Sequence, residues 1–304
     1  MKLHHLRNVV AIVERGSLRA AAKNLGLAQP AMSRSIKELE QELGVVLFQR
    51  NKFGMTLTPV GEIFVRRAKG MLMEFQRTLD EIEQVKGKDF GVITAAFSAA
   101  GHLALLPKMI GPFRRRFPNM RLKVVEGTFP VLETDIRDGI IDLYYGAVSK
   151  GAADPALVVD TLFENKRIIV ARPGHPLGKA TTLKELVGAS WVAAPVAIDS
   201  DSEVNSLFEG EGLPTPHIAM QASTCMSLLS IIAASDLLAP LPQQWIDFIE
   251  STHLIERIPI QTVQVAPRIC AVRRANVPLT PAAEYLNDLA LRASAIHLRE
   301  RRPV

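Results

Sequence analysis

A pair of short helices joined by a tight turn, predicted within residues 17–40, constrains the fold of this chain most strongly. Ser17 is a good N-cap, because its hydroxyl can accept a hydrogen bond from a backbone amide one turn further on. The alanine run that follows favours a helix and lets a second helix approach closely. Gly26 can end this helix in the left-handed conformation, and Pro30 suits the first turn of the next helix, where no N–H is needed.

The second of these helices has one apolar and one polar face. Its apolar stripe, expected to face a core, consists of Met32, Ile36, Leu39 and Leu43. Ser33, Arg34 and Lys37 lie on the opposite face, and Gln29 lies near the start of the helix. Polar and basic side chains at this end of a helix can reach base edges and phosphates in the major groove. The pattern therefore predicts a DNA-binding helix-turn-helix, whereas a basic helix that merely faces solvent is the alternative.

A small wing is predicted directly after the helices. Residues 47–58 form two short extended runs around a turn that contains Gly54. Arg50 and Lys52 lie on these runs, where they are expected to contact backbone phosphates, which position a protein without reading sequence.

The region 1–60 resembles the winged helix-turn-helix of the LysR-type transcriptional regulators. The matching residues include Leu6, Gly16, Ser17, Leu18, Ala20, Ala21, Ala22, Leu25, Gln29, Pro30, Ala31, Ser33, Ile36, Leu39, Glu40, Leu43, Gly44, Leu47, Phe48, Arg50, Leu57, Thr58 and Gly61. The resemblance implies that the residues matching Gln29, Pro30, Ser33 and Arg34 enter the groove, and that the residue matching Arg50 contacts the backbone. Ala28 departs from the family, which usually has Ser there, and the lost cap costs about 1 kcal/mol. The predicted DNA-binding residues are Ser17, Gln29, Pro30, Ser33, Arg34, Lys37, Arg50 and Lys52.

Charge is unevenly distributed along the 304 residues. The net charge is +5, and residues 1–88 hold 15 Lys or Arg against 9 Asp or Glu, whereas the rest holds 21 against 22. Basicity confined to one region indicates that only this region contacts nucleic acid. No export signal and no apolar run of membrane-spanning length is present in the sequence, so we expect a cytoplasmic protein.

A long linker helix is predicted after the wing, with Thr58 as its N-cap, Pro59 in its first turn and an end near Gly87. Its apolar seam has a period of about 3.5 residues over roughly three heptads. The seam consists of Phe64, Ala68, Met71, Phe75, Thr78, Ile82 and Val85. We expect a dimer through Phe64, Ala68, Met71, Phe75 and Ile82, while packing against the chain's own domain is the alternative. The resemblance implies the same dimerisation, a tetramer, and RNA polymerase as a partner.

Strands and helices alternate after Gly91, which predicts parallel sheets covered on both faces and two subdomains that meet at a ligand-binding cleft. The predicted strands are 92–97, 121–125, 142–145, 167–171, 190–193, 217–220, 237–241 and 268–273, and the predicted helices include 104–117, 131–139 and 226–234. A final helix is expected from the Thr280-Pro281 cap to Ala293.

This region resembles the LysR effector-binding domain, which implies a fold like that of the type 2 periplasmic binding proteins. The matching residues are Leu105, Leu106, Pro107, Phe113, Phe117, Pro118, Glu126, Gly127, Gly139, Asp142, Leu143, His175, Pro176 and Leu177. The chain is expected to leave the first subdomain near Phe163 and to return near Pro267. The predicted domains are 1–58 (winged helix-turn-helix), 59–88 (linker and dimerisation helix) and 89–304 (effector-binding domain, with subdomain I at 90–162 and 267–304 and subdomain II at 163–266).

Three hydroxyl residues match the effector-binding positions of the family: Ser98, Thr128 and Thr224. Hydroxyls and free amides at helix starts suit a small carboxylate, although ordinary helix capping is the alternative for each residue. The sequence 234–236 departs from the Gly-containing turn of the family. Asp236 therefore either alters ligand preference or caps a strand.

Catalysis and metal binding find little support in the sequence. The seven histidines are scattered, and no HExxH, CxxC, GxSxG or glycine-rich phosphate motif is present. We expect a ligand-responsive transcription regulator with no enzyme activity, no metal and no cofactor. A small-molecule binding protein without DNA function is one alternative. A thiol-based redox regulator that uses Cys225 and Cys270 is another, since Cys225 lies near a helix start, where a thiol pKa can fall.

Overall fold

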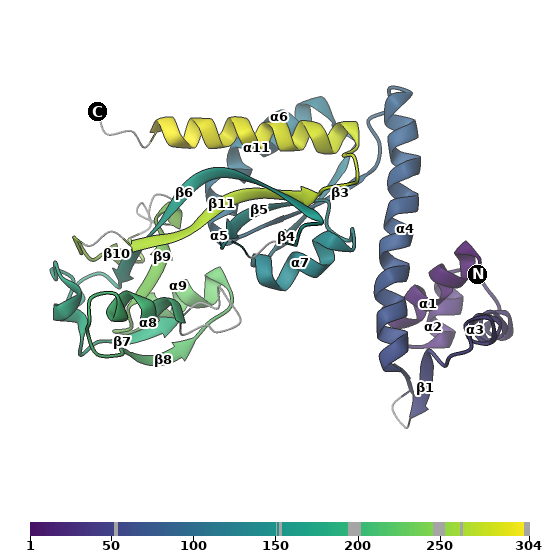
Figure 1. Cartoon of the computed structure of the whole chain (residues 1–304), viewed down its shortest axis with the longest axis horizontal. Helices are drawn as coiled ribbons and strands as arrows, with labels where there is room; N and C mark the ends of the chain where they lie inside the picture. Colours follow the sequence, from purple (N-terminus) through teal and green to yellow (C-terminus); the bar gives the residue numbers. More distant parts are fainter. Residues whose placement is uncertain are drawn as a thin grey trace. The chain divides into compact units, whose positions relative to one another are not determined.

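The computed structural model describes residues 1–51, 54–149, 151, 154–193, 202–245, 253–261 and 264–300. The chain divides into two compact units, which Figure 1 traces from the N-terminus to the C-terminus. Unit 1 comprises Met1–Gly91 with Asp138–Ile140, and unit 2 comprises Val92–Arg137 with Ile141–Val304. Within the described residues, none of the helices is both long and apolar enough to cross a membrane.

Unit 1 contains the predicted helix-turn-helix and wing. Its elements are α1 (Leu3–Arg15), α2 (Leu18–Asn24), α3 (Gln29–Leu43), β1 (Phe48–Asn51), β2 (Gly54–Leu57) and α4 (Pro59–Val85). The Ser17 Oγ accepts a hydrogen bond from the Ala20 amide at 3.1 Å, and Gly26 has a φ of 67°. Pro30 lies in the first turn of α3, so the predicted cap, turn and helix start are all confirmed.

The apolar face of α3 forms the core of unit 1. Met32, Ile36 and Leu39 are at most 4% exposed and pack together with α1 and α2. Leu43 was expected to belong to this stripe, but it is 38% exposed. The reason is its place as the last residue of α3, directly before the left-handed turn at Gly44.

Helix α4 begins and ends where local signals predict. The Thr58 Oγ1 accepts from the Gly61 amide at 3.0 Å, Pro59 opens the helix, and the helix ends at Val85, two residues before Gly87. Gly61 also lets α4 approach the chain before the wing very closely. A Cβ atom at this position would lie 2.1 Å from the Leu47 carbonyl oxygen.

Unit 2 is built on a mixed sheet rather than on the expected parallel sheets. In strand order the sheet is β10-β6-β11-β5-β3-β4, and β9 also pairs with β6. Strands β4, β3 and β5 are parallel, whereas β11 runs antiparallel to both β5 and β6. The prediction of parallel sheets is therefore wrong for this half, because β11 returns as a long strand instead of through a helical crossover. A separate pair, β7 and β8, is parallel.

The elements of unit 2 follow the predicted order, with several differences in length. They are β3 (Val92–Phe97), α5 (Ala99–Ala104), α6 (Leu106–Arg116), β4 (Arg121–Glu126), α7 (Phe129–Arg137), β5 (Leu143–Val148), β6 (Leu157–Ala171), η1 (Leu183–Leu186), β7 (Ser190–Ala193), α8 (Ser202–Glu209), β8 (His217–Gln221), α9 (Cys225–Ala233), β9 (Ala239–Pro242), β10 (Glu256–Arg257), β11 (Gln264–Arg274) and α11 (Pro281–Glu300). The predicted helix 104–117 corresponds to α6, and the final helix extends beyond Ala293. Helices α5 and α8 and residues 157–166 of β6 were not predicted.

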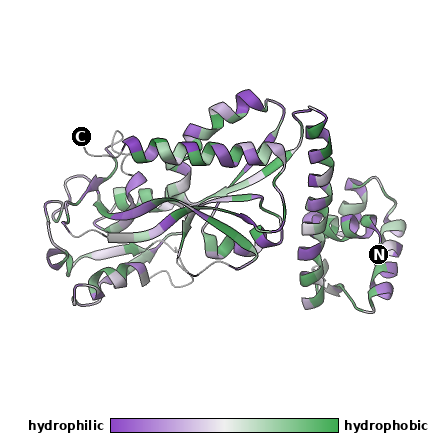
Figure 2. Ribbon diagram, turned by 45° about the horizontal axis from the view of Figure 1, so that its top comes forward, coloured by the Kyte–Doolittle hydropathy of each residue, from purple (hydrophilic) through white to green (hydrophobic). Residues whose placement is uncertain are grey.

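Separate hydrophobic clusters form the core of unit 2, and β6 contributes to more than one. Phe163 packs with Phe97 and Phe113, whereas Ile168 packs with a cluster that includes Trp245. The helices show both hydrophobic and hydrophilic residues along their length (Figure 2), as expected for helices that bury one face. The predicted subdomain boundaries at residues 163 and 267 fall within or beside these shared long strands and stay predictions.

Candidate functional site

The exposed face of α3 gathers the predicted DNA-binding residues. Gln29, Pro30, Arg34 and Lys37 are exposed and Ser33 is partly exposed. The other side of the helix is fixed in place, since the Asn8 Nδ2 donates to the buried Ser35 Oγ at 2.8 Å. Packing therefore leaves a polar, cationic helix face accessible, which is the geometry that a major groove requires.

The remaining predicted DNA contacts lie at the edges of this face. Ser17 is exposed and caps α2. Arg50 lies on β1, opposite Met55 on β2, whereas Lys52 lies outside the described residues. The N-cap of α3, Ala28, makes no side-chain hydrogen bond, which agrees with the expected loss of a cap at this departure from the family.

The predicted dimerisation seam of α4 divides into two groups. Ala68 is 1% exposed and packs with Leu6 and Val10 of α1, and Phe64 packs against the same region. For Ala68 the prediction is wrong, because α1 of the same chain covers it, whereas Phe64 is partly exposed and its role in a dimer stays a prediction. The rest of the seam lies on an open face of the helix together with residues that the prediction missed. We call this set the α4 stripe; it consists of Val60, Ile63, Met71, Phe75, Leu79, Ile82 and Val85, each between 41% and 76% exposed.

Unit 2 contains a cavity of about 370 Å³. Ser98, Thr128 and Thr224 all line it, so the fold brings together three residues that lie far apart in the sequence. Two of them also cap helices: the Ser98 Oγ accepts from the Gly101 amide at 3.3 Å, and the Thr224 Oγ1 accepts from the Ser227 amide at 3.2 Å. Ser98 and Thr224 therefore both cap a helix and line the cavity.

An ion pair on the cavity wall was missed from the sequence. Arg167 of β6 and Glu203 of α8 both line the cavity. Their side chains pair through Nε and Oε1, and again through Nη2 and Oε2 at 3.4 Å. The Arg167 side chain is 5% exposed. The signal that could have found it is the polar run from Glu164 to Arg167, which interrupts an otherwise apolar strand.

Two buried N–H groups of the cavity wall have no hydrogen-bond partner within the described residues. They are the Asn165 Nδ2 and the Trp245 Nε1. Asn165 is 2% exposed and Trp245 is 3% exposed. Buried donors are nearly always satisfied by protein, water or ligand, so these two nitrogens are unsatisfied donors held beside the cavity.

The surroundings of the two thiols disfavour the thiolate form. Burial, followed by the effect of the neighbouring Glu126 carboxylate, raises the pKa of Cys225 to about 12. Burial also raises the pKa of Cys270. The expectation that the start of α9 lowers the Cys225 pKa is therefore wrong, because burial and a neighbouring anion disfavour the thiolate, which is the reactive form.

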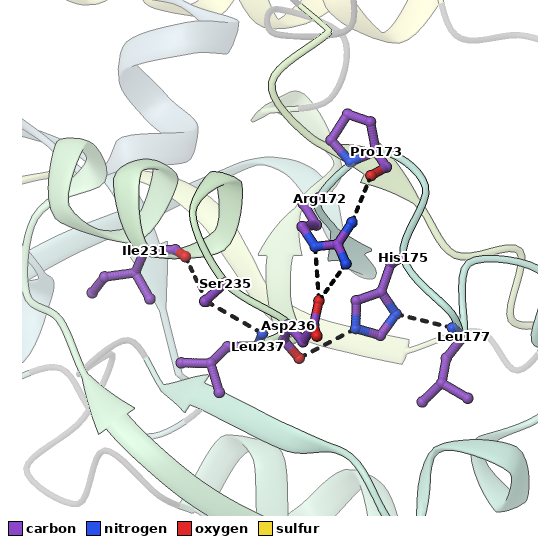
Figure 3. A network of polar contacts seen from close by, with 8 residues as sticks. All are labelled: Arg172, Pro173, His175, Leu177, Ile231, Ser235, Asp236 and Leu237. Atoms are coloured by element: carbon purple, nitrogen blue, oxygen red, sulfur yellow. Dashed lines mark hydrogen bonds and ion pairs between the residues drawn. The ribbon is translucent and has the colours of Figure 1, made fainter.

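Asp236 has a structural place in the turn between α9 and β9 (Figure 3). Both the Arg172 Nε and Nη2 donate to its Oδ1, at 2.7 and 2.6 Å. The Leu177 amide donates to the His175 Nδ1 at 3.0 Å, which leaves the protonated Nε2 of His175 to donate to the Asp236 carbonyl oxygen at 3.2 Å. Asp236 thus ties this turn to the chain after β6, and among the described residues it is not part of the cavity wall.

Comparison with known proteins covers both units. The family model described as the bacterial regulatory helix-turn-helix protein, lysR family, matches residues 3–62. The model described as the LysR substrate binding domain matches residues 86–295.

Relatives and solved structures agree over nearly the whole chain. The transcriptional regulator TdcA of Escherichia coli is 27% identical over 301 residues, which cover 99% of this chain and 96% of TdcA. The regulator BenM of Acinetobacter baylyi is 29% identical over 249 residues, 80% of each chain. The crystal structure of CbnR, a LysR family transcriptional regulator, has a TM-score of 0.73 at 20% identity and covers 97% of this chain and 99% of its own, which shows a shared fold. The structure of CbnR with its target DNA gives a TM-score of 0.72 at 21% identity and covers 96% of this chain and 100% of its own.

Proposed function

The chain belongs to the LysR family of bacterial transcriptional regulators, and we propose that it binds a quasi-palindromic DNA site as a dimer under the control of a small molecule in the unit 2 cavity. The observation that carries this proposal is the exposed α3 face with Gln29, Arg34 and Lys37. These side chains suit the base edges at the floor of a major groove and the phosphates along its rims.

Each part of unit 1 has a distinct proposed role. Gln29, Pro30, Ser33 and Arg34 enter the groove, and Lys37 contacts the DNA from the next turn of α3. Ser17, Arg50 and Lys52 contact backbone phosphates, which fix the position of the protein without reading sequence.

The α4 stripe is proposed to bind a second copy of this chain. Its exposed apolar residues recur at helical spacing along 27 residues of helix, and such a stripe is stable when an equivalent stripe covers it. A two-fold dimer presents two α3 helices to two half-sites, which makes the preferred DNA quasi-palindromic. The proposal also includes assembly of two dimers into a tetramer and contact of the regulator with RNA polymerase in the cytoplasm.

Control is proposed to come from a small carboxylate that contacts Ser98, Thr128 and Thr224 in the cavity. A ligand shifts a conformational equilibrium only by its difference in affinity for the two states. The ligand therefore favours one packing of unit 2, which changes the spacing of paired α3 helices on DNA. This is a role in regulation without catalysis.

Selection from a random double-stranded DNA library tests the proposal with the full-length protein. We expect enrichment of a two-fold symmetric motif, and binding that weakens as salt rises, because phosphate contacts release counterions. Arg34→Ala is expected to lower affinity for the selected site by about 1–3 kcal/mol and to relax base preference at one position of each half-site. The matched control is Arg66→Ala, which removes an exposed arginine from α4. Selection of no motif, or equal losses in both variants, contradicts the proposal.

A further inference from the structure

The one guanidinium of the described cavity wall, that of Arg167, is already paired with a carboxylate of the protein itself. Glu203 lies in the first turn of α8 and pairs in bidentate fashion with Arg167. The Arg167 side chain is 5% exposed and that of Glu203 is 21% exposed. The guanidinium is thus fixed in the wall, whereas the glutamate lies closer to solvent. A planar guanidinium is the side chain best suited to hold a carboxylate through two parallel hydrogen bonds.

Two further donors of the same wall are unused. Asn165 is two residues from Arg167 on β6, so both side chains leave the strand on the same face. The Asn165 Oδ1 accepts from the Lys166 amide at 3.0 Å, while its Nδ2 and the Trp245 Nε1 have no partner within the described residues. One cation and two neutral N–H donors form a donor set that suits the acceptor oxygens of a carboxylate.

We propose that Glu203 occupies the carboxylate position of the ligand in the ligand-free protein. A small monocarboxylate then binds by displacing Glu203 from Arg167 and by accepting hydrogen bonds from Asn165 and Trp245. This inference rests on the proposed function of the cavity, and it makes Arg167, Asn165 and Trp245 the specificity-determining residues.

The charges and the remaining wall support a monocarboxylate with an apolar body. Arg167 is the one cation among the described wall residues, whereas two carboxylates, those of Glu126 and Glu203, line the cavity. A ligand carboxylate that entered without displacing Glu203 would be a third anion beside one cation, which is costly in a desolvated site, whereas exchange of Glu203 for the ligand leaves the number of anions on Arg167 unchanged. Val131, Leu228 and Leu241 supply apolar wall for the rest of the ligand. The exchange frees the first turn of α8 from β6, which gives the ligand a direct structural effect.

Removal of the internal competitor tests this inference. The probes are butyrate, hexanoate and hydrocinnamate, each beside its primary amide, titrated into the full-length protein by calorimetry. Glu203→Gln is expected to tighten binding of at least one carboxylate by about tenfold, because the apparent Kd falls as the competent fraction of the protein rises. The amides are expected to show no such gain. Glu209→Gln, in the last turn of the same helix, is the matched control and is expected to bind like wild type.

The tryptophan donor is tested separately by Trp245→Phe, which keeps the apolar ring and removes the N–H. We expect a three- to tenfold loss of carboxylate affinity, about the effect of one hydrogen bond. Trp191→Phe is the matched control, since Trp191 is also buried with an unpartnered Nε1 but is not part of the described cavity wall.

Glu203→Gln leaves a buried cation unpaired, which can prevent folding. A double variant therefore provides a second test that keeps a paired charge. Arg167→Glu with Glu203→Lys keeps an ion pair and reverses its polarity, so it is expected to retain the fold and to lose carboxylate binding altogether. Unchanged or weaker carboxylate binding in folded Glu203→Gln overturns the inference, as does carboxylate binding by the reversed pair. DNA selection in the absence of ligand tests the proposed DNA-binding function separately from carboxylate binding. Failure of the proposed function can therefore be distinguished from failure of the inference about Glu203.

Discussion

His5 shows at the scale of one residue how burial sets a response to pH. Its side chain is 4% exposed, and neither ring nitrogen has a hydrogen-bond partner among the described residues. Burial lowers the pKa of His5, and the neighbouring His4 lowers it further. The folded state therefore prefers the neutral ring, whereas the unfolded chain binds a proton near pH 6.5. The stability contributed by neutral His5 is complete above this pH and is lost as the pH falls through the lower, folded pKa.

Replacement of this histidine is the matching prediction. His5→Leu removes two unpartnered buried nitrogens at similar volume, so we expect the free energy of unfolding at neutral pH to rise by about 1 kcal/mol. We also expect a smaller loss of stability below pH 6.5, measured by urea unfolding at a series of pH values. The control is His253→Asn, which replaces an exposed histidine of unit 2. A stability curve that keeps its wild-type slope in His5→Leu contradicts this account.

Helix α4 shows at the scale of elements how one glycine sets a packing distance. A Cβ at Gly61 would lie 2.1 Å from the Leu47 carbonyl oxygen, a backbone atom. At Gly111 of α6, the nearest atom to an added Cβ is the Arg115 Nη1 at 3.6 Å, the end of a flexible side chain. The same substitution therefore meets a rigid obstacle at one position and ordinary contact at the other.

This pair of glycines gives a prediction with opposite signs. Gly61→Ala is expected to destabilise unit 1 by about 1–3 kcal/mol, because α4 must move away from the wing. Gly111→Ala is expected to leave stability unchanged or to raise it by up to about 1 kcal/mol through helix propensity. Calorimetry of the full chain resolves the transitions. Equal changes in the free energy of unfolding for the two substitutions would contradict this account of the packing.

The α4 stripe belongs to the scale of the whole molecule, because it concerns what the chain binds. Phe75→Glu places a charge in the middle of the stripe, where Phe75 is 41% exposed. If a second copy covers the stripe, we expect the dimer to dissociate at least about tenfold more easily, since an unpaired charge would be buried. Sedimentation velocity measures the change, and Arg66→Glu, on another face of α4, is the control. A dimer of wild-type strength in Phe75→Glu would place the interface elsewhere.

The sequence by itself determined the features that depend on neighbouring residues. The caps at Ser17 and Thr58, the left-handed Gly26 and the proline starts of α3 and α4 were all predicted. Each is fixed by hydrogen bonds or backbone conformation within a few residues, so the local sequence contains the whole physical cause. Most strands of unit 2 were predicted for the same reason, since apolar runs between turns are local patterns.

Only the tertiary structure decided which of these local features meet. It covered Ala68 with α1 and left Met71 open, although both fit the same seam in the sequence. It ran β11 antiparallel to β5 and β6, and it paired Arg167 with Glu203 across 36 positions of chain. It also raised the Cys225 pKa through burial, against the expected effect of a helix start. Each outcome depends on groups brought together from distant parts of the chain. The local sequence pattern therefore cannot predict which groups lose contact with water or which groups come into contact.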